Sequence, residues 1–222
     1  MLNSISYGFK KFKHDLDLVR RDSFNFSYSL HIELWFKDYL LKKSPIDAGF
    51  PWINYSVIQF LHHSIDRKMK VLEFGAGGSS IFFLKRGVEL FSIEHEKIWI
   101  SEVKKRLAPV QLSKWSPNLV SSNNPKTNIP KPEDYLSPLK NIKNASLDVV
   151  LIDGRHRVES IKQSMSLIKG GGILILDNSD RVDYQEAFTL LTDWSLLNTS
   201  CITNASDFVT PAAIWIKPSF DK

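Results

Sequence analysis

The stretch DVVLIDGRHR (148–157) ends a run of apolar residues in a group of charged side chains. Its four aliphatic residues are typical of a strand buried on both faces, and the chain then supplies Asp153, Arg155, His156 and Arg157. A carboxylate and an imidazole can exchange protons, and a guanidinium can bind a carboxylate or a phosphate through two parallel hydrogen bonds. A turn needs some polar residues but not all of these, so the stretch indicates a functional site at the end of a strand.

A second candidate site is the stretch VLEFGAGGSS (71–80). Gly75 and Gly77 have no Cβ, so the backbone can turn sharply there and come close to a ligand. The dinucleotide-binding fingerprint requires a third glycine where this chain has Ser80, and the fingerprint is therefore not met. Glu73 precedes the first glycine and favours a positively charged ligand, because a carboxylate repels a pyrophosphate.

Glu94 ends the next apolar run, VELFSIE (88–94). Its two oxygens could accept hydrogen bonds from both hydroxyls of a ribose, whereas a surface acid is the alternative. An acid at this point is expected for any adenosine cofactor, so Glu94 does not separate NAD from other cofactors. His95 follows at the rim of the same strand.

These residues need elements that bring them to one place. From residue 69 the pattern alternates between strands and helices, which predicts an α/β, Rossmann-like fold with a mainly parallel seven-stranded sheet flanked by helices. Ligands of such sheets bind at the carboxyl ends of the strands. The predicted strands are 70–75, 88–94, 109–115, 147–153, 171–177, 195–202 and 212–217, and the predicted helices between them are 79–86, 97–107, 156–168 and 183–194.

The region before residue 69 is predicted to be a helical extension, with helices at about 5–20 and 29–43 and a third from Tyr55. We divide the chain into this N-terminal cap (1–68) and the core (69–222), which together form one domain. Trp52 and Tyr55 either close over an organic acceptor or pack in the core. The polar segment 116–138 either faces the substrate or is a flexible insertion.

The composition fits a globular protein of one domain, with 222 residues, 43% hydrophobic and 24% charged. The net charge of +5 is concentrated near the N-terminus, away from the candidate sites, which argues against a nucleic-acid partner. No apolar run approaches the ~20 residues of a membrane span, no signal peptide is recognisable, and Cys201 is the single cysteine. We therefore expect a cytoplasmic protein with no membrane partner, and the sequence leaves its oligomeric state open.

Four segments in order, VLEFGAGGSS, the strand ending at Glu94, DVVLIDG and IKGGGILILDN, resemble the motifs of class I S-adenosylmethionine-dependent methyltransferases. The resemblance covers roughly residues 69–217. It implies S-adenosylmethionine as the cofactor, with the glycine turn beside its methionine and ribose and Glu94 at the ribose hydroxyls. The cofactor-binding residues that it implies are Glu73, Gly75, Ala76, Gly77, Ser79, Glu94, His95 and Asp153.

The same resemblance brings the ends of the fourth and fifth strands together. Asp153, Asp177 and Asn178 then match the Asp, Asp and Asn of the metal-dependent O-methyltransferases of the catechol and caffeoyl-CoA type, which implies Mg²⁺ as a second cofactor. His156 stands where the catechol type has a lysine base, so it and Asp153 are the predicted catalytic residues. The alternative is that Asp153 caps a helix and that 177–180 is an ordinary turn.

The predicted function is methyl transfer to a small-molecule acceptor, favoured at a hydroxyl. Arg155, Arg157 and Arg181 either bind an anionic group of this acceptor or pair with nearby acids. Metal-independent N- or O-methylation with His156 as base is one alternative. Others are a non-catalytic protein that binds an adenosyl cofactor, a nucleic-acid methyltransferase, for which no N-P-P-[YF]-type motif is present, and an NAD oxidoreductase.

Overall fold

The computed structural model describes residues 41, 43–122, 124, 126–206 and 208–219. In this part of the chain seven strands form one sheet in the order β3-β2-β1-β4-β5-β7-β6. Strands β1 to β5 are parallel, and β7 runs antiparallel to both β5 and β6. The strands are β1 (Lys70–Phe74), β2 (Glu89–Glu94), β3 (Trp115–Leu119), β4 (Leu147–Ile152), β5 (Ile168–Asp177), β6 (Ser195–Ile202) and β7 (Val209–Ile216).

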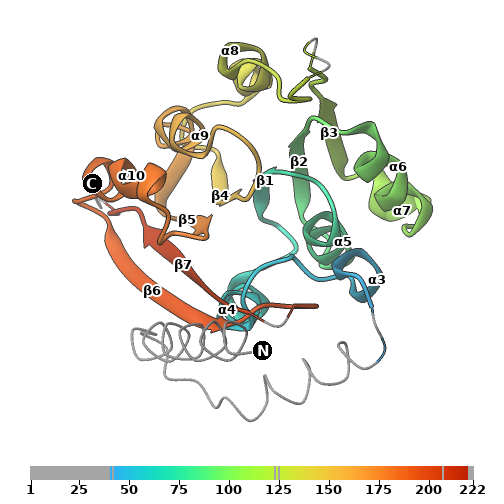
Figure 1. The fold of residues 1–222 in the computed structure, drawn as a ribbon, viewed down its shortest axis with the longest axis horizontal. Helices are drawn as coiled ribbons and strands as arrows, with labels where there is room; N and C mark the ends of the chain where they lie inside the picture. Colours follow the sequence, from blue (N-terminus) through green and yellow to red (C-terminus); the bar gives the residue numbers. More distant parts are fainter. Residues whose placement is uncertain (1–40, 42, 123, 125, 207, 220–222) are drawn as a thin grey trace, which may run out of the picture.

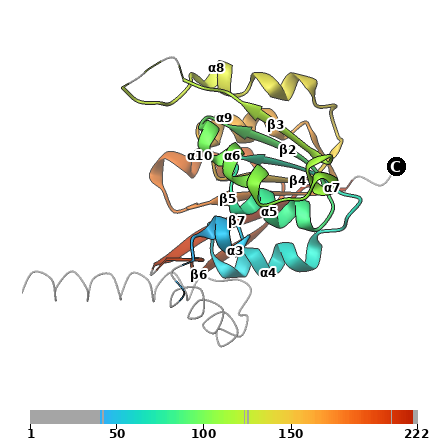
Figure 2. The same cartoon turned by 90° about the vertical axis from the view of Figure 1, so that its right-hand side faces the viewer.

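Helices cover both faces of the sheet (Figures 1 and 2). One face packs against α4, α5 and α6, and the other against α8, η1, α9 and α10. Side chains alternate between the two faces along β1, so that Val71 and Leu72 belong to different apolar clusters. The helices are α3 (Pro45–Ala48), α4 (Tyr55–Ser64), α5 (Gly78–Lys85), α6 (Lys97–Lys105), α7 (Pro109–Leu112), α8 (Pro132–Tyr135), η1 (Ser137–Asn141), α9 (Arg157–Ser164), η2 (Val182–Tyr184) and α10 (Gln185–Leu190).

The carboxyl ends of β1, β2, β4 and β5 meet at one edge of the sheet, because these strands are parallel and adjacent. Asp177 at the end of β5 pairs with Ala212 of β7, so the turn between β6 and β7 lies at this edge as well. The start of α4 is attached to that turn: Asn54 bridges to Thr203, and its side-chain amide donates to the carbonyl oxygen of Thr210 at 2.9 Å. The predicted topology and sheet are thus confirmed.

Some predicted boundaries are wrong. Residues 109–112, predicted to begin the third strand, form α7, because Pro109 suits the first turn of a helix and Gln111 caps the backbone N–H of Ala108 at 2.9 Å. Strand β3 instead starts at Trp115 and runs into the predicted loop, and it tolerates Pro117 because it is an edge strand. Helix α9 ends at Ser164, and β5 begins earlier than predicted, at Ile168.

The predicted helix at 5–20 lies outside the described residues, as does that at 29–43 apart from Leu41 and Lys43. Helices α3 and α4, also part of the predicted cap, contribute to the same apolar cluster as β1 and α5, and the division at residue 68 stays a prediction. Among the described helices, none is long and apolar enough to span a membrane.

Candidate active site

Glu73 is buried on β1 beneath the glycine turn. Its carboxylate accepts hydrogen bonds from the hydroxyls of Ser79 and Ser92 at 2.6 Å each, and from that of Ser80. Trp115 in turn donates its indole N–H to Ser92 at 2.7 Å. Burial raises the pKa of Glu73 to about 7, although the three hydroxyl donors oppose the shift. The Ser79 hydroxyl thus donates to Glu73 and holds the turn in place, and its contact with a cofactor stays a prediction.

Glu94 lies at the end of β2, beside the turn. Oε2 accepts the backbone N–H of Ala76 at 2.8 Å, and Oε1 accepts those of His95 at 2.6 Å and Glu96 at 2.7 Å. The ring Nδ1 of His95 lies 2.8 Å from Oε1. Burial alone would raise the pKa of Glu94, but these donors outweigh it and lower the pKa, so the group is an anion at neutral pH. Oε2 keeps a lone pair for a further donor, such as a hydroxyl of a ribose.

The glycine turn leaves room for a ligand on one side only. Gly75 adopts φ +94°, and a Cβ there would lie 3.5 Å from the Cα of Gly154, so the loops after β1 and β4 nearly touch. A Cβ at Gly77 would meet nothing within 4 Å. A Cβ at Gly78 would overlap the carbonyl oxygen of Phe50 and lie 2.6 Å from that of Pro45. Gly77 thus faces open space. Gly78 has the opposite role, because only a residue without a Cβ lets the backbone of Pro45 and Phe50 pack this closely against the turn, and the sequence did not predict this.

Tyr135, from the predicted loop 116–138, covers the ends of β2 and β4. Its hydroxyl donates to the carbonyl oxygen of Ile93 at 3.3 Å and accepts the backbone N–H of Arg155 at 3.4 Å. Burial raises the pKa of this phenol. A Cβ on Gly154 would overlap the Tyr135 hydroxyl, so the glycine is required for this contact. Sequence reasoning missed Tyr135, whose only signal was its place in that segment.

Arg157 connects the ends of β4 and β5. Its guanidinium donates to the carbonyl oxygens of Gly154 and Asp153 at 3.1 Å each and to that of Asp177 at 2.6 Å, and also to Oδ1 of Asp153 at 2.9 Å. The Tyr184 ring lies on its other side, with its centroid 5.4 Å from Cζ. Only 9% of the side chain is exposed. Four of its five N–H donors are thus engaged within the protein, although Arg157 also lines the cavity, and its contact with substrate stays a prediction.

The two aspartates beside Arg157 are closely coupled. Burial raises the pKa of Asp153, against the opposing effects of Arg157 and of a hydrogen bond from Asp177. Burial raises the pKa of Asp177 further above its usual range, and the neighbouring Asp153 adds to this effect. Oδ1 of Asp177 is buried without a hydrogen-bond partner among the described residues. The two carboxyls thus share one buried position, and each raises the cost of a negative charge on the other.

The predicted Mg²⁺ ligands do not fit a divalent cation. Asp153 is paired with Arg157, Asp177 lies 3.9 Å from the same guanidinium, and Oδ1 of Asn178 accepts from Nη2 of Arg181 at 2.9 Å. A metal ion here would have to approach two fixed positive charges. The described residues also contain no group of three or more His, Cys, Asp or Glu side chains placed to hold a metal.

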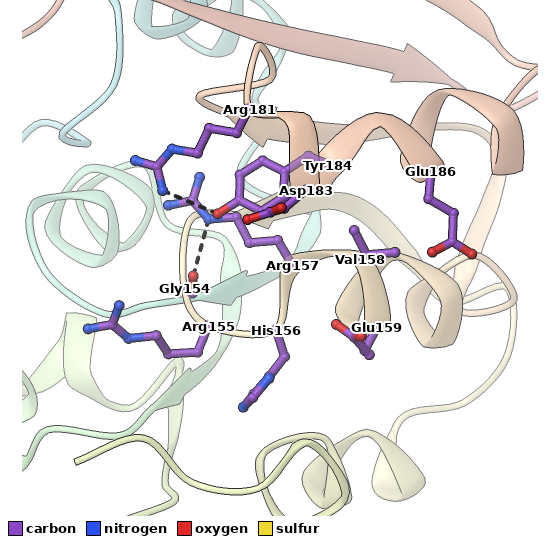
Figure 3. A pocket seen from close by; sticks show the side chains of 10 residues that line it. All are labelled: Gly154, Arg155, His156, Arg157, Val158, Glu159, Arg181, Asp183, Tyr184 and Glu186. Atoms are coloured by element: carbon purple, nitrogen blue, oxygen red, sulfur yellow. Dashed lines mark hydrogen bonds between the residues drawn. The ribbon is translucent and has the colours of Figure 1, made fainter. Parts of the chain in front are cut away.

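His156 adopts the left-handed conformation, φ +50°, at the start of α9, and Asn178 does the same at the end of β5, φ +52°. Nε2 of His156 lies 2.8 Å from the carbonyl oxygen of Pro130. A carbonyl only accepts, so Nε2 carries the proton and Nδ1 is the atom left to act as a base. In Figure 3 the ring points away from the three arginines, toward the segment before α8.

A cavity of about 320 Å³ opens around the turn after β4 (Figure 3). Arg155 and Arg181 extend toward the same side of Gly154. Nε of Arg155 lies 3.4 Å from Nε2 of His95. Within the described ranges, no carboxylate lies at ion-pair distance from either of these two guanidiniums. The cavity is lined by Gly154, Arg155, His156, Arg157, Val158, Glu159, Arg181, Asp183, Tyr184 and Glu186.

The two predicted aromatic contacts differ in exposure. Tyr55 is 2% exposed and its hydroxyl donates to Oδ1 of Asn204 at 3.1 Å, so its predicted role in substrate binding is wrong and it belongs to the core. Trp52 is 59% exposed. The backbone carbonyl groups of its two neighbours in the sequence, Pro51 and Ile53, accept hydrogen bonds from Asn204 and so fix the backbone on both sides of Trp52. Trp52 is thus at the site's edge of the sheet and open to solvent.

No protein-family model and no curated protein matches the sequence. Solved structures do. The O-methyltransferase TomG from Streptomyces achromogenes, involved in tomaymycin synthesis and solved with SAM, superposes with a TM-score of 0.61 at 16% identity, over 91% of this chain and 99% of TomG. The chain has the class I methyltransferase fold.

Two further structures agree with this fold. A caffeoyl-CoA O-methyltransferase-like protein from Staphylococcus aureus has a TM-score of 0.54 at 16% identity, over 92% of this chain and 98% of its own. A methyltransferase-like protein from Silicibacter pomeroyi has a TM-score of 0.50 at 19% identity, over 74% and 86%. At these sequence identities the comparisons establish the fold but not the substrate.

Proposed function

We propose that the protein transfers a methyl group from S-adenosylmethionine to a hydroxyl of a small-molecule acceptor, without a metal ion. The observation that carries this proposal is the arrangement at the carboxyl edge of the sheet. The open face of Gly77 and the anionic Glu94 lie at the same edge of the sheet as the end of β4, where the partly exposed Asp153 immediately precedes Gly154, a residue that lines the cavity. The proposed cofactor site and the proposed acceptor site would then be adjacent, as a direct transfer requires.

The residues around the glycine turn fit S-adenosylmethionine. Gly77 gives space for the ligand, Oε2 of Glu94 would accept from a ribose hydroxyl, and His95 would hold Glu94 in place. Buried Glu73 supports the turn through Ser79 rather than touching the ligand. When bound, the cofactor supplies a methyl group on a positively charged sulfur as the electrophile.

The acceptor hydroxyl must lose a proton as it attacks, and two residues could take it. Asp153 is 29% exposed at its side chain and is held in one orientation by Arg157. His156 offers Nδ1, since Nε2 is bonded to Pro130. We favour Asp153, because the His156 ring is directed away from the arginine side of the cavity (Figure 3).

Paired variants separate these two bases. Asp153→Asn should lower kcat by roughly 100-fold, the usual contribution of a positioned base, with the affinity for S-adenosylhomocysteine unchanged. His156→Asn keeps the left-handed backbone, which asparagine tolerates, and should lower kcat only a few-fold. The opposite ranking of the two variants would assign the base to His156.

We further propose that the acceptor carries an anionic group. Arg155 and Arg181 are exposed on the same side of the cavity and have no carboxylate partner in the described part of the chain. Arg181→Gln should raise KM for a carboxylate or phosphate acceptor roughly tenfold or more, as expected for a lost charge-assisted hydrogen bond, and leave KM for a neutral analogue unchanged. Lys162→Gln, which removes an α9 cation paired with Glu186, is the control. Equal effects on charged and neutral acceptors would contradict the proposal.

The direct test is turnover. The purified protein, incubated with radiolabelled S-adenosylmethionine and a panel of hydroxy acids, phenols and amines, should label hydroxyl-bearing acceptors and produce S-adenosylhomocysteine. Cofactor binding with no transfer to any acceptor class would favour a non-catalytic binding protein. Labelling of amines alone would change the proposal to N-methylation.

A further inference from the structure

We propose that Arg157 is the fixed cation of this site: its guanidinium takes the place between Asp153 and Asp177 that a divalent metal would need. We also infer that Arg157 is a positioning residue, which orients Asp153 for the proposed methyl transfer. The second statement rests on the proposed function, whereas the first concerns the protein alone and can be tested without turnover.

The hydrogen bonds of Arg157 define this role. Three of its bonds go to main-chain carbonyl oxygens, two after β4 and one at the end of β5, so the guanidinium fixes the spacing of the two strand ends. A fourth bond goes to Oδ1 of Asp153. The planar, multi-donor guanidinium can satisfy all four acceptors at once, whereas a lysine ammonium is a compact charge with three donors.

The surroundings of Arg157 also exclude a metal ion from the same position. A divalent ion between Asp153 and Asp177 could enter only if the guanidinium left, and three carbonyl oxygens, one of them in a buried hydrogen bond, would then lose this donor. Arg157 is 9% exposed and lies against the ring of Tyr184, so leaving would also break its packing. The wild-type protein should therefore bind no divalent metal at this point.

The unpartnered oxygen of Asp177 indicates that a metal ion could bind here if Arg157 were removed. Oδ1 of Asp177 is buried with no hydrogen-bond partner among the described residues, and Oδ2 is 3.9 Å from Nη1 of Arg157, beyond hydrogen-bond range. Removing the Arg157 side chain would leave the two carboxylates beside an empty volume, while Oδ1 of Asn178 stays bonded to Arg181. These are oxygen ligands of the kind that Mn²⁺ and Mg²⁺ prefer.

The first test is a Mn²⁺ titration followed by electron paramagnetic resonance, which reports free Mn²⁺. Wild type should show no site, whereas Arg157→Ala should bind one ion per chain, with an affinity at least tenfold above any residual binding of Mn²⁺ by wild type. Arg181→Ala is the matched control: it removes the arginine bonded to Asn178 but leaves Arg157 in place, so it should bind no Mn²⁺. A stoichiometric Mn²⁺ site in wild type would overturn the proposal, as would equal binding by the two variants.

The second test measures the positioning role. Turnover by wild type should be unchanged by EDTA. Arg157→Ala should lose most of kcat, keep its affinity for S-adenosylhomocysteine, and recover kcat when guanidinium chloride is added at millimolar, non-denaturing concentration, but not with sodium chloride. Loss of wild-type turnover in EDTA, or the absence of guanidinium rescue in a folded variant, would overturn it.

Two outcomes have separate meanings. If wild type neither binds S-adenosylhomocysteine nor turns over, the proposed function fails, while the Mn²⁺ titration still decides whether Arg157 excludes a metal. If Arg157→Ala does not fold, the wild-type results decide: Mn²⁺ binding or EDTA sensitivity would refute the role of Arg157, and the absence of both would support it.

Discussion

Replacing Glu73 by glutamine should change how the stability of the protein depends on pH. Burial raises the pKa of Glu73 from 4.5 to about 7, while Ser79, Ser80 and Ser92 donate to it. A shift of this size corresponds to about 3 kcal/mol, because each pKa unit is worth 1.36 kcal/mol. Glutamine has nearly the same shape and cannot ionise, so Glu73→Gln removes the titration. Its oxygen can still accept from Ser80 and Ser92, and its NH2 group can donate to the Ser79 hydroxyl.

The sign follows from proton linkage. Between about pH 4.5 and 7 the unfolded chain releases the Glu73 proton while the folded protein retains it, so the free energy of unfolding falls as the pH rises. The stability that this carboxyl contributes is present below its unfolded pKa and is lost as the pH passes the folded pKa. Relative to Glu73→Gln, wild type should therefore lose up to about 3 kcal/mol over this interval and change little above it.

Urea unfolding at several pH values, monitored by tryptophan fluorescence, measures this difference. Glu94→Gln is the control of opposite sign: the pKa of Glu94 is lowered, so its contribution is present at neutral pH and is lost as the pH falls through its folded pKa. A difference between wild type and Glu73→Gln that is independent of pH from about 4.5 to 7 would refute the buried, protonated state of Glu73.

Three further predictions concern the glycines of the site. Gly77→Ala should leave the melting temperature nearly unchanged, because its Cβ meets open space, yet weaken binding of S-adenosylhomocysteine measured by calorimetry. Gly78→Ala should instead destabilise the fold by roughly 1–3 kcal/mol through overpacking, and equal melting temperatures for the two variants would contradict this reading. Gly154→Ala should also destabilise the fold, since the added Cβ overlaps the Tyr135 hydroxyl. Tyr135→Phe removes that hydroxyl and should restore part of the lost stability in a double-mutant cycle. Strictly additive effects of the two substitutions would mean that the added Cβ and the hydroxyl do not touch.

Much of the fold follows from the sequence, because periodicity and turn residues act locally. The alternation of apolar strands with amphipathic helices placed β1, β2, β4 and β6 to within one residue at each end. Local rules failed where two of them competed: the apolar residues in PVQLSKW suggested a strand, but Pro109 and the cap from Gln111 favoured a helix.

The partners of polar side chains could not be predicted in the same way. Asp153 and Arg157 are four residues apart, a spacing that would have allowed an ion pair, but the bond of Arg157 to the backbone of Asp177 depends on how β4 and β5 sit side by side. The serines around Glu73 come from α5 and β2, and only the folded chain brings them together. The residue types indicated which side chains could take part in binding or proton transfer. The tertiary contacts determined which of these side chains are already bonded within the protein.

Calorimetric titration of the wild-type protein with S-adenosylhomocysteine, with and without EDTA, tests the proposed cofactor site directly. We expect a single site of micromolar affinity that EDTA leaves unchanged and that Gly77→Ala weakens. The absence of binding in a folded sample would mean that the chain keeps the class I methyltransferase fold without its cofactor, and would contradict the proposed function.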